Sequence, residues 1–138
     1  MKRVFAIACA VGLIACGKSS TAPATANVVG DWGGSMSDAI LGSGTIGLAL
    51  TQTSDSVYGT WSTSYPNSAG NLSGNLSGTV SGSTLILIMK PSNPTTCQFG
   101  PLDMTATVAG TAMSGKIVTT PCSTDDSATV VLQRVSSR

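Results

Sequence analysis

Side chains that could carry out covalent chemistry are few in this sequence of 138 residues, which contains no histidine and no glutamate. Without an imidazole, neither a Ser-His-Asp nor a Cys-His arrangement can form. All six carboxylates are aspartates, and only Asp125 and Asp126 are adjacent. Such a pair in a Ser-rich turn is typical of a solvated loop, because it lacks the alternating oxygen ligands of calcium loops. We therefore expect a protein that is not an enzyme and that holds no metal or cofactor.

The four cysteines are the remaining reactive groups, and Cys16 is the most informative of them. It ends the run Leu13-Ile14-Ala15-Cys16, which closes an apolar stretch behind two basic residues. This pattern is typical of a secretory signal and is too short to span a bilayer permanently. The run resembles the bacterial lipobox, in which the cysteine at the cleavage point becomes the lipidated first residue. The resemblance implies a lipoprotein signal peptide over residues 1–15 and lipid attachment at Cys16, and the alternative is an ordinary secretory signal.

Lipidation at Cys16 would hold the protein to a membrane without a transmembrane helix, since two or more acyl chains such as palmitate anchor stably. In Gram-negative lipoproteins an aspartate after the cysteine signals retention in the inner membrane, so Gly17 favours the outer membrane. Residues 16–27 combine this cysteine with Ser, Thr, Ala and Pro, a composition typical of a flexible tether. The expected location is the cell envelope, with the membrane as a partner.

The folded domain is expected over residues 28–138, which is enough chain for one modest core. Removing Lys2 and Arg3 with the signal leaves five basic residues against six aspartates in residues 16–138. The net charge of the chain without its signal is therefore 5 − 6 = −1. No basic stripe is present, and nucleic-acid binding is not expected.

Single apolar residues interleave with Ser, Thr and Gly along this domain, and no stretch has a sustained helical period. The pattern predicts an all-β fold with eight strands. They are expected at Val28–Ser37, Gly44–Thr53, Ser56–Ser64, Asn71–Val80, Thr84–Lys90, Leu102–Val108, Ala112–Thr119 and Ser127–Val135.

Three antiparallel hairpins are predicted from apolar positions that face each other at a constant sum of residue numbers. The sums are 107 around Ser54, 165 around Gly82-Ser83 and 219 around Ala109-Gly110. Three agreeing sets favour a meander of adjacent hairpins. Representative predicted pairs are Leu50 with Val57, Leu48 with Gly59, Ile46 with Trp61, Gly78 with Leu87, Leu76 with Met89, Met104 with Gly115 and Leu102 with Ile117.

The sum of 219 also places Cys97 opposite Cys122, which favours a disulfide in an exported protein. Such a closure would lower the entropy of the unfolded chain and so stabilise the folded state by about 3 to 4 kcal/mol on the loop-entropy model. A metal pair or a reactive thiol is the alternative, but the chain has no histidine to complete a zinc site or to activate a thiolate.

Eight meandering strands avoid free edges by closing into an antiparallel up-and-down barrel, and a two-sheet β-sandwich is the alternative. Within the first strand, Gly30-Asp31-Trp32 resembles the Gly-X-Trp signature of the calycins, and the likeness is strongest for their avidin-like branch. The resemblance implies that Arg134, near the last strand, packs across Trp32 at the closed end of the barrel. It does not extend to biotin binding, because the chain lacks a recognisable biotin-binding set.

Two hypotheses for function follow from the predicted faces. Inward-facing glycines would either leave an apolar cavity or let the strands coil until the barrel fills itself. In the first case this non-catalytic lipoprotein binds an apolar small molecule in a cavity lined by Leu48, Trp61, Leu87 and Met104. In the second, it is a structural or protein-interaction module of the envelope, with an outward partner patch at Ile86 and Ile88. The residues predicted to face inward are Ile46, Leu48, Leu50, Val57, Trp61, Leu72, Leu76, Val80, Leu85, Leu87, Met89, Met104, Met113, Ile117, Val130 and Leu132, together with Gly59, Gly74, Gly78 and Gly115.

Overall fold

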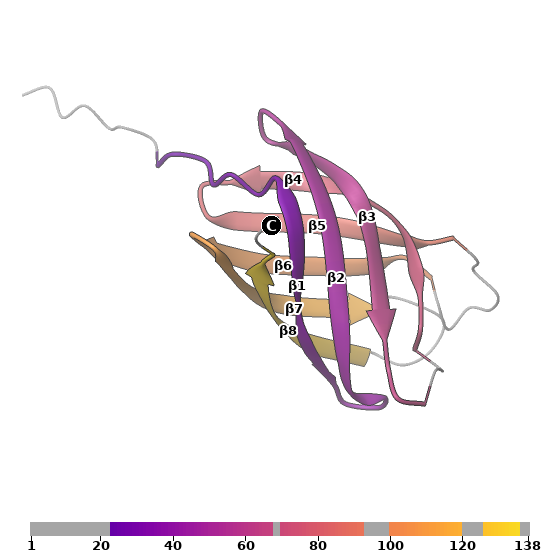
Figure 1. The fold of residues 1–138 in the computed structure, drawn as a ribbon. Coiled ribbons are helices and arrows are strands. Elements are labelled where there is room, and N and C mark those ends of the chain that lie inside the picture. Colours follow the sequence, from indigo (N-terminus) through magenta and orange to yellow (C-terminus); the bar gives the residue numbers. More distant parts are fainter. Residues whose placement is uncertain (1–22, 68–69, 93–99, 120–125, 136–138) are drawn as a thin grey trace, which may run out of the picture.

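The computed structural model of the chain describes residues 23–67, 70–92, 100–119 and 126–135. Eight antiparallel strands form a closed barrel in chain order (Figure 1). The predicted meander barrel is confirmed, and the sandwich alternative is wrong, because the first strand pairs with the last. The strands are β1 (Gly30–Asp38), β2 (Gly42–Thr53), β3 (Ser56–Ser64), β4 (Ser73–Ser81), β5 (Thr84–Pro91), β6 (Leu102–Ala109), β7 (Ala112–Thr119) and β8 (Asp126–Arg134).

Several predicted features lie outside the described residues. They are the signal peptide, the lipid attachment site at Cys16, the proposed disulfide between Cys97 and Cys122, and the carboxylate of Asp125. In the part of the chain that is described, no helix has the length and apolar character needed to cross a membrane.

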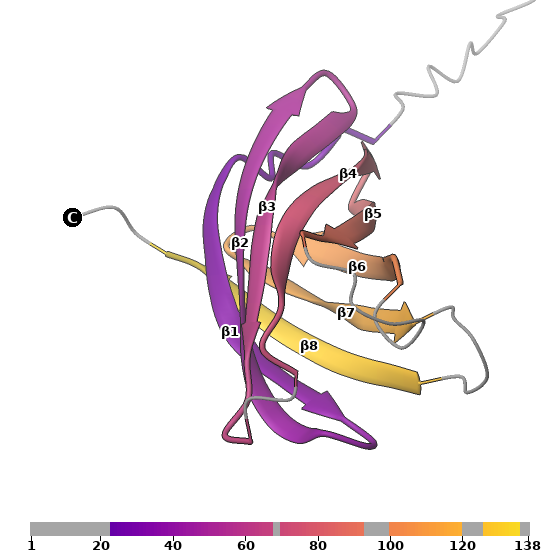
Figure 2. The same ribbon diagram turned by 90° about the vertical axis from the view of Figure 1, so that its right-hand side faces the viewer.

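Alternating burial along the strands places the core inside the barrel. In β6 every second side chain from Leu102 to Val108 is buried and its neighbours are exposed, as the two-residue period of a strand requires. Of the sixteen apolar side chains predicted to face inward, all are buried except Leu72, which is partly buried. Figure 2 shows the barrel from the side, with the strands of one wall running across those of the other. The buried core further includes Val28, Trp32, Met36, Tyr65, Leu102, Ala106, Val108 and Ala128.

Two of the three predicted registers are wrong by two residues. Leu48 lies opposite Trp61 in the β2–β3 pair, and Met104 lies opposite Ile117 in the β6–β7 pair. These pairs sum to 109 and 221, whereas the β4–β5 register of 165 is confirmed. A shift of two leaves every side chain on its predicted face, so the core survives the error. It also removes the register argument for joining the two cysteines, and their disulfide stays a prediction.

The error arises in the turns. The two-residue loops begin with Ser54 and Gly110, one residue later than predicted, just as the β4–β5 loop begins with Gly82. Each first loop residue has a positive φ, of 58° at Ser54, 63° at Gly110 and 55° at Gly82. Such hairpin turns need a left-handed first residue, and glycine adopts this conformation most readily.

Glycines on the inward face are sites of close backbone approach. A Cβ added at Gly78 would lie 1.9 Å from the carbonyl oxygen of Ile86 on the neighbouring strand. Gly59, Gly74 and Gly115 are equally obstructed by the backbone of an adjacent strand. These glycines therefore let the strands coil closely, which is the filled-barrel alternative of the sequence analysis.

The segment before β1 closes one end of the barrel. Ala26 donates its amide to the carbonyl of Gly82 over 2.7 Å, and Val28 donates its amide to Gln52 Oε1 over 2.9 Å. The side chain of Val28 is fully buried, and Ala26 packs against the core. Docking thus begins within the stretch predicted as tether. We call residues 26–29 the plug.

Candidate functional site

The closed end is built around an arginine on an indole. The ring of Trp32 is buried, and its Nε1 donates to the carbonyl of Val28 over 2.9 Å. Above the ring, the Arg134 guanidinium carbon lies 4.5 Å from the centroid. Arg134 also donates to the carbonyls of Val29 and Asn27, the latter over 2.6 Å. A partly buried cation is thereby satisfied by an aromatic face and two carbonyl dipoles, and it ties the plug to the barrel.

The register and one glycine explain how this arrangement is positioned. Trp32 and Arg134 face each other in the β1–β8 pair that closes the barrel. Gly30, which joins the plug to β1, has a φ of 119°, and a Cβ there would lie 3.5 Å from the arginine Nη1. A positive φ of this size favours glycine, so the chain can turn from the plug into the strand. The plug, held by Trp32 and Arg134, therefore closes this end of the barrel.

The four residues of the predicted ligand cavity all point into the barrel. Leu48 and Trp61 are 3% exposed, and Leu87 and Met104 are 0% exposed. A side chain with no accessible area borders no space large enough for a water molecule. The interior is therefore filled around Leu87 and Met104.

Trp61 sits at the boundary between this interior and the outer surface. Its inward-facing indole lies across from Gly74 on β4, and its Nε1 donates to the carbonyl of Asn75 over 3.2 Å. Trp61 thus uses its polar atom to bind the neighbouring strand.

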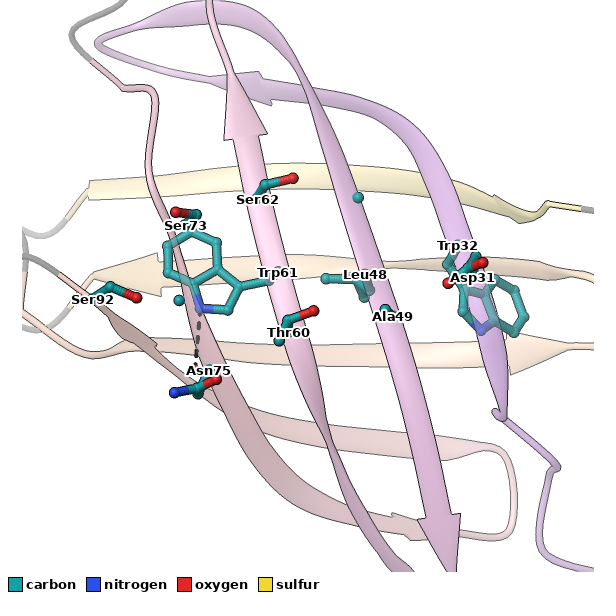
Figure 3. A pocket seen from close by; sticks show the side chains of 12 residues that line it. Asp31, Trp32, Leu48, Ala49, Thr60, Trp61, Ser62, Ser73, Asn75 and Ser92 are labelled. Carbon is teal, nitrogen blue, oxygen red and sulfur yellow. Dashed lines mark hydrogen bonds between the residues drawn. The ribbon is translucent and has the colours of Figure 1, made fainter.

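A hollow of about 540 Å³ opens on the outer face of β1–β4 (Figure 3). Outward-facing small and polar residues line it, with inward-facing Trp32, Leu48, Trp61 and Gly74 beneath them. Sequence reasoning missed this hollow. The signal that could have found it is the pair of small residues on β2 facing polar residues on β3. The outward lining consists of Asp31, Gly47, Ala49, Thr60, Ser62, Ser73, Asn75 and Ser92.

Tyr65 lies at the other end of the barrel, beside the loop that joins β3 to β4. Burial raises the pKa of its phenol to about 12, and the carboxylates of Asp38 and Asp126 contribute further. The phenol therefore stays protonated at neutral pH and is no base there. The backbone amide of Tyr65 donates to Asn71 Oδ1 over 2.6 Å, which holds the loop. Among the described residues, no three metal-ligating side chains of the His, Cys, Asp and Glu types gather.

An apolar strip lies on the outer face of β3 and β5, and we define it by Tyr58, Ile86 and Ile88. These side chains are 52%, 51% and 43% exposed. Tyr58 and Ile88 flank Ser77 of β4 in one line of the register. The two isoleucines therefore point outward as predicted, on a surface otherwise rich in Ser and Thr.

The fold and its closed end define an eight-stranded antiparallel barrel with one plugged end. Neither a family model nor a curated protein matches the chain.

Proposed function

We propose that the protein is a non-catalytic module of the cell envelope, lipid-anchored at Cys16, which engages a protein partner through the apolar strip. The filled interior carries this proposal. An apolar ligand inside the barrel needs space beside Leu87 and Met104, and both side chains have no accessible area. Binding is then left to the outer surface, where Ile86 and Ile88 are the exposed large apolar side chains of β5. Exposed apolar patches of this kind mark contacts with other proteins.

We also propose that the barrel is calycin-like, which is supported by the contact of Arg134 with Trp32 and by the plug that closes the same end. The lipobox supports export, and in an oxidising compartment Cys97 and Cys122 would form the disulfide. An outer-membrane location, favoured by Gly17, belongs to the same proposal.

Site-specific photo-crosslinking in intact cells tests the partner. A photoreactive amino acid at position 88 should give a discrete adduct with another envelope protein. The matched control is position 131, since Val131 is also exposed, at 56%, and lies on β8. In a second step, Ile88→Lys should abolish the adduct made from position 86, whereas Val131→Lys should preserve it. Identical adducts from positions 88 and 131, or none from either, would refute the partner surface.

Native mass spectrometry separates this proposal from the apolar-ligand hypothesis. Protein extracted from cells should have the same mass under native and denaturing conditions, because a covalent lipid stays attached in both. A defined additional mass lost on denaturation would establish an occupied cavity and overturn the filled barrel.

A further inference from the structure

We propose that the outer hollow of β1–β4 binds a neutral saccharide chain, a role independent of the apolar strip and its protein partner. The hollow crosses the strands instead of following them. Asp31, Ala49, Thr60 and Asn75 face one another in successive pairs from β1 to β4. Four strands at about 4.8 Å spacing span about 14 Å, which suits an extended ligand of a few rings.

The depth of the hollow comes from the small residues in its middle. Gly47 and Ala49 of β2 face Ser62 and Thr60 of β3. A Cβ added at Gly47 would lie 3.6 Å from Ser62 Oγ, an ordinary contact distance. Nothing in the local backbone therefore requires a glycine at position 47. Because Gly47 has no side chain, it leaves space on the surface.

The lining determines the chemical class of the ligand. Hydroxyl groups of Thr60, Ser62 and Ser73 and the amide of Asn75 offer both donors and acceptors. The carboxylate of Asp31 is the one charged group in the lining, and it makes no hydrogen bond or ion pair within the described part of the chain. A carboxylate accepts hydrogen bonds from neighbouring sugar hydroxyls and repels anions. The set fits a ligand rich in hydroxyl groups and without charge.

Two other extended ligands fit less well. A peptide that binds by strand addition needs a free sheet edge, and the closed barrel has none among its eight strands. A single-stranded nucleic acid needs cationic side chains and exposed aromatic faces. The lining has no lysine or arginine, and both of its tryptophans are buried.

Saturation-transfer NMR on the full chain tests the site, with tri-N-acetylchitotriose and maltotriose as neutral probes. At least one probe should receive saturation from the protein. Ala49→Phe fills the hollow with an outward side chain and should weaken binding at least tenfold. The control Thr129→Phe places the same ring on the exposed outer face of β8 and should bind as the parent protein does.

Asp31→Asn provides a second variant that keeps the shape of the hollow. It should weaken binding severalfold while leaving the circular dichroism spectrum unchanged, so the test holds even if Ala49→Phe does not fold. Absence of binding by the parent protein to both probes would overturn the site. Equal binding by the parent, Ala49→Phe and Asp31→Asn would do the same. Neither result bears on the crosslinks from position 88.

Discussion

Replacing Arg134 by methionine should destabilise the barrel by about 3 kcal/mol. The change removes two hydrogen bonds from a charged donor to the carbonyls of Val29 and Asn27. At this partly exposed site each is worth about 1 kcal/mol, below the usual range for charged groups. Loss of the cation from the face of Trp32 adds about 1 kcal/mol. Methionine keeps much of the apolar stem, so the loss reports on the charge and the donors.

Arg134→Lys should recover about half of this loss, because an ammonium keeps the charge but cannot reach two carbonyls with a planar fork. The assay is urea unfolding followed by tryptophan fluorescence, with the free energies compared at equal m-values. Lys116→Met on the exposed face of β7 is the control and should change stability by less than about 0.5 kcal/mol. Hydrogen exchange should also accelerate at the amide of Ala26, because loosening the plug weakens the hydrogen bond from this amide to the carbonyl of Gly82. The reasoning fails if Arg134→Met costs no more than the control.

Three further predictions concern the interior and the end opposite the plug. Gly78→Ala should cost more than about 2 kcal/mol in urea unfolding, because its Cβ meets the carbonyl of Ile86, whereas Gly47→Ala should stay within about 0.5 kcal/mol. Equal costs would contradict the close approach of β4 to β5. Tyr65 should ionise near pH 12 when phenolate absorbance is followed; because unfolded tyrosine loses its proton near pH 10, stability should fall as the pH rises between these values. Tyr65→Phe should remove that part of the decline, and an unchanged pH profile would exclude Tyr65 as its source. Met104→Ala should cost about 2 to 5 kcal/mol and leave a dry void that binds xenon, whereas a cost well below this range would indicate space already present beside Met104.

The core could be predicted from the sequence because the strand period is two. Apolar residues at alternate positions, as from Leu102 to Val108, identify the inward face whatever the register. For the same reason, an error of two residues at Ser54 and Gly110 left the faces intact. Glycine at the first loop position predicted the β4–β5 register. The same rule applied to Gly110 would have given the correct β6–β7 register, whereas no sequence signal marks the positive φ of Ser54.

The outer hollow and the plug could not be predicted in the same way. The hollow depends on how four strands align. The β2–β3 register, which places Ala49 opposite Thr60, follows a turn at Ser54 that carries no clear sequence signal. Ala26 lies in a stretch of Ser, Thr, Ala and Pro whose composition is typical of a tether. Its place in the barrel follows from the hydrogen bond that its amide donates to the carbonyl of Gly82, a contact between residues far apart in the chain.

The pairing of β1 with β8 makes the sheet a ring, and a ring of sequential antiparallel strands has no intrinsic first member. The same neighbours would be kept if the chain were joined from Val135 to Asn27 and opened at the tight turn that follows Asp38. That turn is held by the Asp38 carboxylate, which accepts hydrogen bonds from the amides of Ile40 and Leu41. The architecture is thus compatible with circular permutation, and the genetic order of the strands is one of several that could encode the same barrel.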